Sequence, residues 1–292
     1  MNKLRPDKLI DIIGQEDVKK VLQIAIESAR IRNCVIPSFL LEGPKGTGKS
    51  TICMAVGNEL GVHTYVVNGG EVTSPKNLLP TLMKLKSKDI MFIDEIHRIN
   101  VKVSEFLYPC IEDFKLDSMG ESIILPRFTF AGATTESGSI APPLYDRFTY
   151  KLELQLYSVE ELSTIITLSA QKLGLDIDDS AAHNLARRAR GTPRIGNNLI
   201  LFLRDFVVSK GSRTVRNEHV DSALDLVKID ADGTTEQDRA YLRALKKAGK
   251  PMGLSTLADT LSIDSATVSG IIEPHLLRLN KIRRTPKGRV LI

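Results

Sequence analysis

The chain has 292 residues, and 42% of them are hydrophobic, which is enough for two or three domains that each bury a core. A membrane or secreted protein is not expected, because the sequence has no run of about eighteen apolar residues and no apolar signal segment at its start. Cys34, Cys53 and Cys110 lack metal or redox spacing, which favours small buried side chains in a reducing cytoplasm.

The net charge of +5 is unevenly distributed along the chain. The stretch from Glu236 to Ile292 carries eleven Lys or Arg and five Asp or Glu residues, a net charge of +6. The rest of the chain is then close to neutral, at −1. An excess of positive charge confined to one terminal module indicates that this module meets a polyanion.

In chain order, the first expected element is a helix over residues 16–32, with apolar residues at helical spacing. An apolar strand over residues 38–41 leads into Gly43-Pro-Lys-Gly-Thr-Gly-Lys49-Ser50, and a helix over residues 51–60 follows. A strand, a glycine-rich loop and a helix in this order predict a phosphate-binding loop. Residues 43–50 are called the P-loop below.

The residue types of the P-loop explain how it would bind a triphosphate. Gly43, Gly46 and Gly48 let backbone N–H groups turn inward at the positive end of a helix dipole. Lys49 would neutralise the β- and γ-phosphate oxygens, and the Ser50 hydroxyl would coordinate Mg²⁺. The alternative, a glycine-rich turn without a ligand, is disfavoured because the motif and its context agree.

A second strong signal follows an expected strand at 62–67 and an expected helix at 75–86. The apolar run 90–93 predicts a buried parallel strand, and Asp94 and Glu95 stand at its carboxyl end, where α/β sheets bind ligands. Asp94 can reach the magnesium shell, and Glu95 can polarise a water for attack on the γ-phosphorus. The alternative is a strand that ends in an acidic turn.

Two weaker candidates come after an expected helix at 101–114 and a short hairpin or loop at 115–127. A strand from 128 would end at Thr134, which would either contact the γ-phosphate region or only stabilise a turn. A turn-helix segment from 142 leads to Arg147, beside Asp146. Such an arginine is most often part of a surface ion pair, and the functional alternative is a charge delivered to another subunit's phosphate.

Four helices with short connections then predict a small bundle. They cover residues 158–173, 178–190, a segment that opens at 192–194, and 218–227. Arg194 lies in the first turn of the third helix, where a cation opposes the helix dipole. A bound phosphate would relieve that conflict, and a solvated arginine is the alternative.

Beyond a polar linker at 228–235, three expected helices and a terminal hairpin predict a winged helix. The hairpin is rich in basic residues, so it is either a solvated surface or a contact with nucleic-acid phosphates. It lacks interleaved aromatic residues, which favours binding that does not depend on the base sequence. The helices cover 236–248, 254–261 and 265–279, and the basic residues are Arg283, Arg284, Lys287 and Arg289.

The fold class predicted from these elements is α/β, with a parallel-sheet P-loop domain, a helical lid and a winged helix. The expected domain boundaries are 1–156, 157–229 and 230–292.

Several strings in the chain together resemble the RuvB family, AAA+ motors that drive branch migration of Holliday junctions. The resemblance covers nearly the whole chain, and several of the strings are specific to this family rather than to P-loop proteins in general. They are Leu4-Arg5-Pro6, Ile13-Gly14-Gln15, the P-loop, Phe92-Ile-Asp-Glu-Ile-His-Arg98, Leu107-Tyr-Pro109, Glu112-Asp-Phe-Lys-Leu-Asp117, Gly132-Ala-Thr-Thr135, Asp146-Arg-Phe148, Arg190-Gly-Thr-Pro-Arg194 and Arg284-Thr-Pro-Lys-Gly-Arg289.

The resemblance implies a cytoplasmic hexameric ring that binds ATP and Mg²⁺ between neighbouring subunits and acts on DNA. Catalytic roles would fall to Lys49, Asp94 and Glu95, to Thr134 as sensor 1, to Arg194 as sensor 2 and to Arg147 as an arginine finger for the adjacent subunit. Nucleotide contacts would also come from Gly46, Ser50 and Thr51, from Leu4, Arg5 and Tyr157 near the adenosine, and from the backbone of Glu112, Asp113 and Phe114. Arg284 and Arg289 match the family's DNA-contacting arginines.

The sequence departs from the family pattern at four places. Lys45 and Thr47 lie in the P-loop where the family usually has a proline and a leucine, and Ser50 replaces a threonine but keeps the hydroxyl. Tyr145 stands where the family usually has an arginine. The segment from Ser118 to Leu125 is short, where the family has a longer hairpin that contacts the adaptor RuvA. A RuvA-like partner is therefore in doubt, whereas the nucleotide chemistry should be retained.

Three functions follow from these observations. The first is an ATP-driven motor on branched or duplex DNA, in recombination and repair. The second is an AAA+ loader, similar to a clamp loader, that acts on DNA with a partner other than RuvA. The third, a DNA-binding scaffold with a residual nucleotide site, is disfavoured by the intact set of Lys49, Asp94, Glu95 and Arg147.

Overall fold

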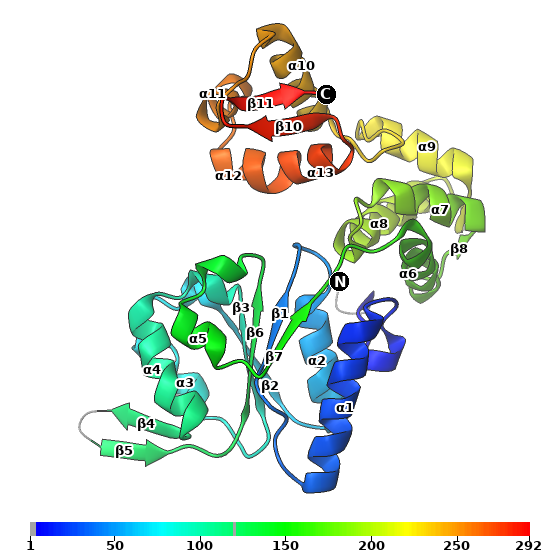
Figure 1. Ribbon diagram of the computed structural model, residues 1–292. Coiled ribbons are helices and arrows are strands. Elements are labelled where there is room, and N and C mark those ends of the chain that lie inside the picture. Colours follow the sequence, from blue (N-terminus) through cyan, green and yellow to red (C-terminus); the bar gives the residue numbers. More distant parts are fainter. Residues whose placement is uncertain (1–3, 119–120) are drawn as a thin grey trace. The chain divides into compact units, whose positions relative to one another are not determined.

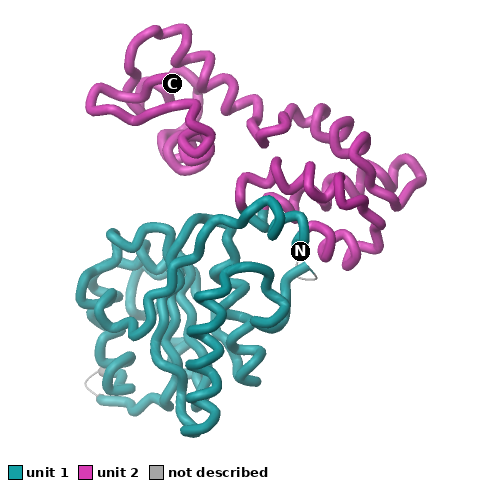
Figure 2. Tube along the Cα trace, turned by 45° about the vertical axis from the view of Figure 1, so that its right-hand side comes forward, with its two compact units in different colours: residues 1–165, 192–194 teal, residues 166–191, 195–292 magenta. Residues whose placement is uncertain are grey.

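A computed structural model describes residues 4–118 and 121–292 of the chain (Figure 1). The chain forms two compact units (Figure 2). Unit 1 contains the residues up to 165 together with 192–194, and unit 2 contains residues 166–191 and 195–292. None of the helices in the described ranges is both long enough and apolar enough to span a membrane.

Unit 1 is built on a five-stranded sheet in which all neighbouring strands run parallel. The strand order is β2-β3-β6-β1-β7, so β6 lies between the strand that leads to the P-loop and the strand that ends in Asp94. The strands are β1 (Phe39–Glu42), β2 (Thr64–Asn68), β3 (Ile90–Asp94), β6 (Thr129–Thr134) and β7 (Tyr150–Glu153).

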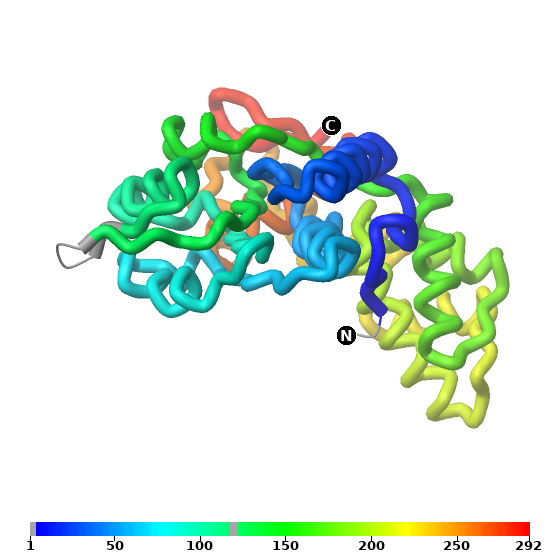
Figure 3. Tube along the Cα trace, turned by 90° about the horizontal axis from the view of Figure 1, so that it is seen from below, coloured from blue at the N-terminus to red at the C-terminus, as the bar shows by residue number. Residues whose placement is uncertain are grey.

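Helices cover both faces of this sheet, because successive strand residues point to opposite sides. Phe39 and Leu41 pack toward one helical layer, whereas Leu40 packs toward the other. The first layer contains α1 (Glu16–Arg32) and α2 (Lys49–Leu60), which lie side by side in Figure 3. The second contains α3 (Leu79–Leu82), α4 (Val101–Glu112) and α5 (Pro142–Asp146).

One helix expected in unit 1 is wrong in detail. The helix expected at 75–86 is instead a 3₁₀ turn, Pro75–Asn77, followed by the four-residue α3. Pro80 accounts for the break, because it lacks an N–H group and its ring would clash with a carbonyl one turn earlier. In addition, the sequence analysis did not foresee β7, which pairs with β1 at the edge of the sheet.

The short hairpin expected at 115–127 is present (Figure 1). Its antiparallel strands are β4 (Lys115–Ser118) and β5 (Glu121–Ile124), and they begin directly after α4. Ile124 is 81% exposed at the end of β5. The hairpin thus offers a small, partly apolar surface next to α4.

The lid helices come next: the first part of α6, up to residue 165, belongs to unit 1, and the rest of the lid, apart from residues 192–194, belongs to unit 2. The expected capping box of the first helix is confirmed by bonds between Ser158 and Glu161, which stabilise the start of α6. The second helix ends earlier than expected, at Arg188, because Arg190 and Gly191 adopt positive φ angles. The helices are α6 (Val159–Lys172), α7 (Asp179–Arg188), α8 (Pro193–Ser209) and α9 (Asn217–Leu226), and the short strands β8 (Asp176–Ile177) and β9 (Thr214–Val215) pair in parallel.

The remainder of unit 2 is a winged helix, as expected. Its core contains Tyr241, Leu257, Val268 and Leu276. The helix expected at 265–279 contains a π-helical turn, Val268–Ile272, between α12 (Ser265–Thr267) and α13 (Glu273–Arg278). The other elements are α10 (Glu236–Ala248), α11 (Leu254–Leu261) and the two antiparallel strands of the wing, β10 (Ile282–Thr285) and β11 (Gly288–Leu291).

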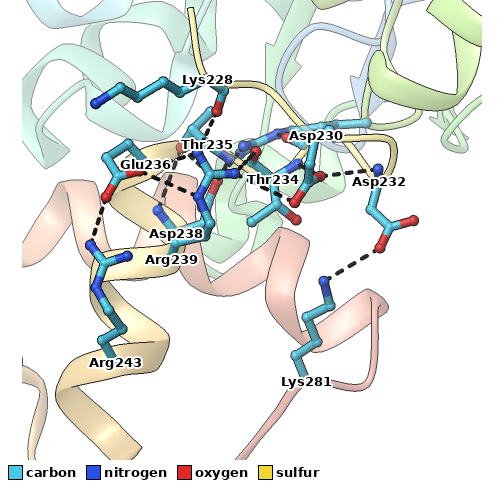
Figure 4. A network of polar contacts seen from close by, with 12 residues as sticks. Lys228, Asp230, Asp232, Thr234, Thr235, Glu236, Asp238, Arg239, Arg243 and Lys281 are labelled. Carbon is cyan, nitrogen blue, oxygen red and sulfur yellow. Dashed lines mark hydrogen bonds and ion pairs between the residues drawn. The ribbon is translucent and has the colours of Figure 1, made fainter. Parts of the chain in front are cut away.

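A polar network ties the linker before α10 to that helix (Figure 4). Asp238 accepts hydrogen bonds from the backbone and hydroxyl of Thr235, which caps the helix. Arg239 donates to the carbonyls of Lys228 and Thr234. From the end of the lid segment, Arg190 donates to the Gly233 carbonyl and pairs with Asp238, so lid and winged helix share a buried ion pair within unit 2.

Candidate functional site

The P-loop lies between β1 and α2 and has the backbone that a phosphate cradle needs. Gly43 has φ 140°, and a Cβ there would lie 2.4 Å from the Leu154 carbonyl oxygen. Gly46 has φ 87°, and a Cβ there would approach Arg194 Cβ at 3.2 Å. Both positions therefore exclude side chains, which leaves the loop N–H groups accessible at the start of α2.

Lys49 folds back over the P-loop. Its Nζ donates hydrogen bonds to the carbonyl oxygens of Gly43 at 2.6 Å and Pro44 at 2.9 Å. Burial lowers the pKa of Lys49 to about 8, while nearby Asp94 acts to raise it and Arg194 to lower it further. Because burial disfavours this ammonium group in its charged form, an anion placed beside it would stabilise its charge.

Ser50 and Asp94 bring a hydroxyl and a carboxylate together at the carboxyl edge of the sheet. The Ser50 hydroxyl donates to Asp94 Oδ2 at 2.6 Å, and the Glu95 N–H donates to Asp94 Oδ1 at 3.0 Å. Oxygen donors of this kind suit Mg²⁺, which keeps several waters and needs few protein ligands. Within residues 4–118 and 121–292, no cluster of three His, Cys, Asp or Glu side chains could hold a metal by itself. With two oxygen donors, the Ser50–Asp94 pair fits an ion held mainly by phosphate and water.

Glu95 follows Asp94 in a left-handed backbone conformation, with φ 52°. Its carboxylate accepts a hydrogen bond from Arg98 Nη1 at 3.0 Å. That bond, together with the charges of Arg98 and Lys45, lowers the pKa of Glu95, against a smaller opposite effect of burial. The carboxylate is therefore charged at neutral pH and able to accept a proton or orient a water.

Thr134 is buried at the end of β6, beside Glu42 of β1. Its hydroxyl lies 3.0 Å from His97 Nδ1 and accepts a hydrogen bond from the Glu136 N–H at 2.8 Å. The central position of β6 places this hydroxyl between the P-loop strand and the strand of Asp94, as the strand order requires.

Two further expected site residues, Arg194 and Tyr157, lie close to the P-loop within unit 1. The Arg194 N–H donates to the Gly46 carbonyl at 3.4 Å. Tyr157 is buried, burial raises its pKa to about 12, and its hydroxyl would lie 3.8 Å from a Cβ on Gly48. Leu4 is buried, whereas Arg5 is exposed, and Thr51 is half-buried in the first turn of α2.

Arg147 lies in a separate cluster beside α4. Its Nη2 donates to Glu112 Oε2 at 3.1 Å, and its Nε lies 3.1 Å from Oε1 of the same carboxylate. The guanidinium also stacks 4.1 Å from the centroid of the Tyr108 ring, and Nη1 donates to the Pro143 carbonyl at 2.6 Å. The side chain remains 23% exposed, so it lies on the surface with a fixed orientation.

The residues of segment 112–114 have different surroundings: Glu112 and Asp113 are exposed, whereas Phe114 packs against another aromatic ring. Glu112 contacts Arg147, as described, and Asp113 is exposed at the end of α4. Phe114 has φ 54° and packs edge-on against Phe128. A position of this segment near the adenosine of a nucleotide therefore stays a prediction.

The basic residues of the terminal hairpin form the second candidate surface. Arg283 and Lys287 are exposed on the wing. Arg284 and Arg289 pair across β10 and β11, and both contact the carboxylate of Glu273 beneath them. The sequence predicts that these four basic residues share one hairpin, but it gives no signal for their carboxylate partner.

The sequence analysis did not assign roles to His97, Arg98 or Glu273, although each contacts a predicted site residue. A signal was available for the first two, because they lie two and three residues after Glu95 in the chain. Glu273 lies 11 residues before Arg284, on the preceding helix, and no spacing rule in the sequence links it to the wing.

Three family models match consecutive parts of the chain. The P-loop domain of the Holliday junction DNA helicase RuvB matches residues 4–154. The RuvB AAA lid domain matches residues 157–230, and the RuvB C-terminal winged helix domain matches residues 231–292.

Individual relatives agree over nearly the full length. The Holliday junction branch migration complex subunit RuvB of Synechococcus sp. (strain RCC307) is 42% identical over 99% of this chain and 87% of that protein. The corresponding subunit of Kosmotoga olearia is 42% identical over 98% of this chain and 87% of that protein. The structure of the Thermotoga maritima RuvB Holliday junction branch migration motor matches with a TM-score of 0.91 and 38% identity, over 99% of this chain and 96% of that one.

Proposed function

The chain belongs to the RuvB family, and from this premise we propose that it works as a hexameric ring that uses ATP hydrolysis to drive branch migration of Holliday junctions. The observation that carries the proposal is the Ser50–Asp94 contact of 2.6 Å beside the P-loop, in a chain that also has the lid and the winged helix of the family. In this proposal the three matched segments are three domains: the P-loop domain and the lid bind and hydrolyse the nucleotide, and the winged helix contacts DNA.

Nucleotide binding is assigned to the P-loop and the start of α2. The loop N–H groups would hold the phosphates, and Lys49 would exchange the carbonyls of Gly43 and Pro44 for phosphate oxygens. Because burial depresses the pKa of Lys49, an anionic ligand would raise that pKa and fix the charged form. Leu4, Arg5 and Tyr157 complete the site at the adenosine end in this proposal.

Ser50 and Asp94 would hold Mg²⁺ on the phosphates, where the ion would neutralise charge that develops on the oxygens. Glu95 would orient and polarise the attacking water, and Thr134 would position that water or the γ-phosphate from the tip of β6. Arg194 would contact the γ-phosphate from the first turn of α8.

Arg147 is proposed to act on a neighbouring subunit. Its own subunit holds it on the surface through Glu112 and Tyr108, and its contacts join it to α4 and α5 rather than to the P-loop residues. A preoriented surface guanidinium is what a neighbour's phosphate requires in a ring of identical subunits with head-to-tail interfaces. Such a finger typically supplies about a thousandfold or more in turnover.

The winged helix is proposed to contact DNA through phosphates, with Arg283, Arg284, Lys287 and Arg289 as the contact residues. Their position on one hairpin and the local net charge of +6 from residue 236 onward support a backbone contact that does not depend on sequence. A cytoplasmic location belongs to the same proposal.

The adaptor is the part of the proposal most specific to this chain. β4 and β5 have only four residues each, so we propose an adaptor other than RuvA, or none, at this hairpin. The same feature favours the second candidate function, an AAA+ loader that assembles another protein on DNA. A loader would show DNA-dependent turnover without movement of the junction.

One experiment separates these outcomes. ATPase rates are measured with four-way junction DNA, with and without a RuvA protein, together with dissociation of the junction. Junction movement and DNA-stimulated turnover without a need for RuvA would support the proposal. Stimulation by RuvA would support the motor but overturn the changed adaptor, and turnover without junction movement would favour the loader.

A further inference from the structure

Glu273 is a charged residue with no role in the functions proposed so far. It starts α13, and none of its surface is exposed to solvent. A buried carboxylate is retained only where charged or hydrogen-bonding partners replace its lost hydration. Its partners therefore indicate what it does.

Three side chains converge on this carboxylate, and two of them are the proposed DNA-contacting arginines. Arg284 Nε donates to Oε2 at 2.8 Å, and its Nη2 lies 2.7 Å from the same atom. Arg289 donates from Nε to Oε1 at 2.8 Å and from Nη2 to Oε2 at 3.4 Å. The Tyr241 hydroxyl donates to Oε1 at 3.1 Å, so both carboxylate oxygens have partners.

The two arginines need such a partner because of their place in the wing. Arg284 and Arg289 lie directly opposite each other on β10 and β11. Like charges directly opposite each other on a strand pair repel, and an anion beneath both removes that repulsion. Two backbone hydrogen bonds with Met252 also fix the chain at Arg289, so the guanidinium groups lie on a rigid base.

Both arginines keep part of their side chains in solvent. The exposed fraction is 50% for Arg284 and 19% for Arg289, whereas Glu273 has none. Two guanidinium groups and one carboxylate leave a single net positive charge, and the half-exposed Arg284 presents part of it to solvent. A guanidinium group that is already oriented loses less conformational entropy when it binds a phosphate.

We propose that Glu273 is a positioning residue for DNA binding, which holds Arg284 and Arg289 in the orientation that receives backbone phosphates. This inference rests on the proposed function, in which the wing contacts DNA. Tyr241 supports the carboxylate from the core of the winged helix, so the arrangement links α10, α13 and both strands of the wing.

The substitution Glu273→Gln tests the inference through the sign of its effect. It removes a negative charge from a DNA-binding module, so long-range electrostatics alone would make DNA binding tighter. Loss of positioning predicts the opposite, namely weaker binding and a salt dependence lower by about one phosphate contact. The matched control is Asp259→Asn, which removes one negative charge from the exposed surface of α11.

The measurement is equilibrium binding of the full-length protein to one four-way junction DNA over a series of salt concentrations. Thermal unfolding of each variant checks that it is folded. We expect Glu273→Gln to bind more weakly than both the parent and Asp259→Asn. Tyr241→Phe, which removes one hydrogen bond to the carboxylate without a change of charge, should weaken binding in the same direction but less, and it serves if Glu273→Gln does not fold.

Binding by folded Glu273→Gln, or failing that by Tyr241→Phe, as tight as that of Asp259→Asn would overturn the inference. The double variant Arg284→Ala with Arg289→Ala shows which statement has failed. If that variant binds weakly, the wing is still the DNA-contacting surface and only the positioning role is lost. If it binds like the parent, the proposed contact surface is wrong, and the role of Glu273 falls with it.

Discussion

The carboxylate of Glu112 contacts the guanidinium of Arg147 through two pairs of atoms, each 3.1 Å apart. Glu112 is the last residue of α4, and the hairpin β4–β5 begins three residues later. The proposed finger is therefore held by the helix that leads to the proposed adaptor surface. Its orientation on one subunit is set before any neighbour is present.

The first prediction is that Arg147 acts in trans. Arg147→Ala and Lys49→Ala should each lose ATPase activity, by about a thousandfold for the finger. When the two variants are mixed in equal amounts, about one quarter of the interfaces in a random ring pair an intact P-loop with an intact Arg147. ATPase activity should therefore return in the mixture. If the mixture stays as inactive as either variant alone, Arg147 does not serve a neighbouring site.

The second prediction concerns the Ser50 hydroxyl, which donates to Asp94. Ser50→Ala should lower turnover about tenfold or more and shift the Mg²⁺ concentration needed for half-maximal rate upward, because a hydrogen bond to a charged group is worth about 1.5–3 kcal/mol. Ser50→Thr keeps the hydroxyl and is the matched control. If Ser50→Ala and Ser50→Thr need the same Mg²⁺ concentration for half-maximal rate, the hydroxyl is not a metal ligand.

The third prediction is a change in pH dependence. The hydrogen bond from Arg98 is the largest cause that lowers the pKa of Glu95. Arg98→Ala should raise that pKa, so the fall in turnover at acidic pH should begin at a higher pH than in the parent. Turnover against pH is compared with that of Arg187→Ala, which removes an exposed arginine from α7. If turnover falls at the same acidic pH in both variants, Arg98 does not control the charge of Glu95.

The fourth prediction concerns the stability of unit 2. Burial, assisted by the charge of Arg190, lowers the pKa of His275 from 6.5 to about 4. Between these values the unfolded chain binds a proton that the folded chain does not, so stability is lost as the pH falls from about 6.5 toward 4. The unfolding midpoint of the parent should therefore drop over this window. His275→Gln should flatten that drop, whereas His183→Gln at an exposed position of α7 should not.

Much of unit 1 could be predicted because its signals are local. The P-loop carries its strand, its glycines and its helix within about twenty residues, and the run before Asp94 is apolar without interruption. β7 escaped prediction because Tyr150–Glu153 alternates polar and apolar residues over only four positions at the sheet edge. A pattern that short does not distinguish a strand from a loop.

The missing parts of the site depend on contacts between different elements of the fold. Glu273 meets Arg284 and Arg289 only because the wing folds back onto α13. Similarly, Glu112 meets Arg147 across 35 residues, and sequence spacing carries no signal for either contact. A carboxylate in a helix is ordinarily a solvated residue, and for Glu273 only its burial indicates a partner.

The helix at 265–278 has a consequence for movement along DNA. Through its π-helical turn it carries short, uncharged side chains at Ser265, Thr267, Ser269 and Gly270, while the positive charge lies on the wing. A module that recognises bases would bind some steps of a DNA track more tightly than others, by about 1–3 kcal/mol for each mismatched pair. A motor with such a module would stall at its preferred sequences. If the proposed contact with phosphates alone is right, the free-energy landscape along the track would stay nearly level, and each step would cost about the same.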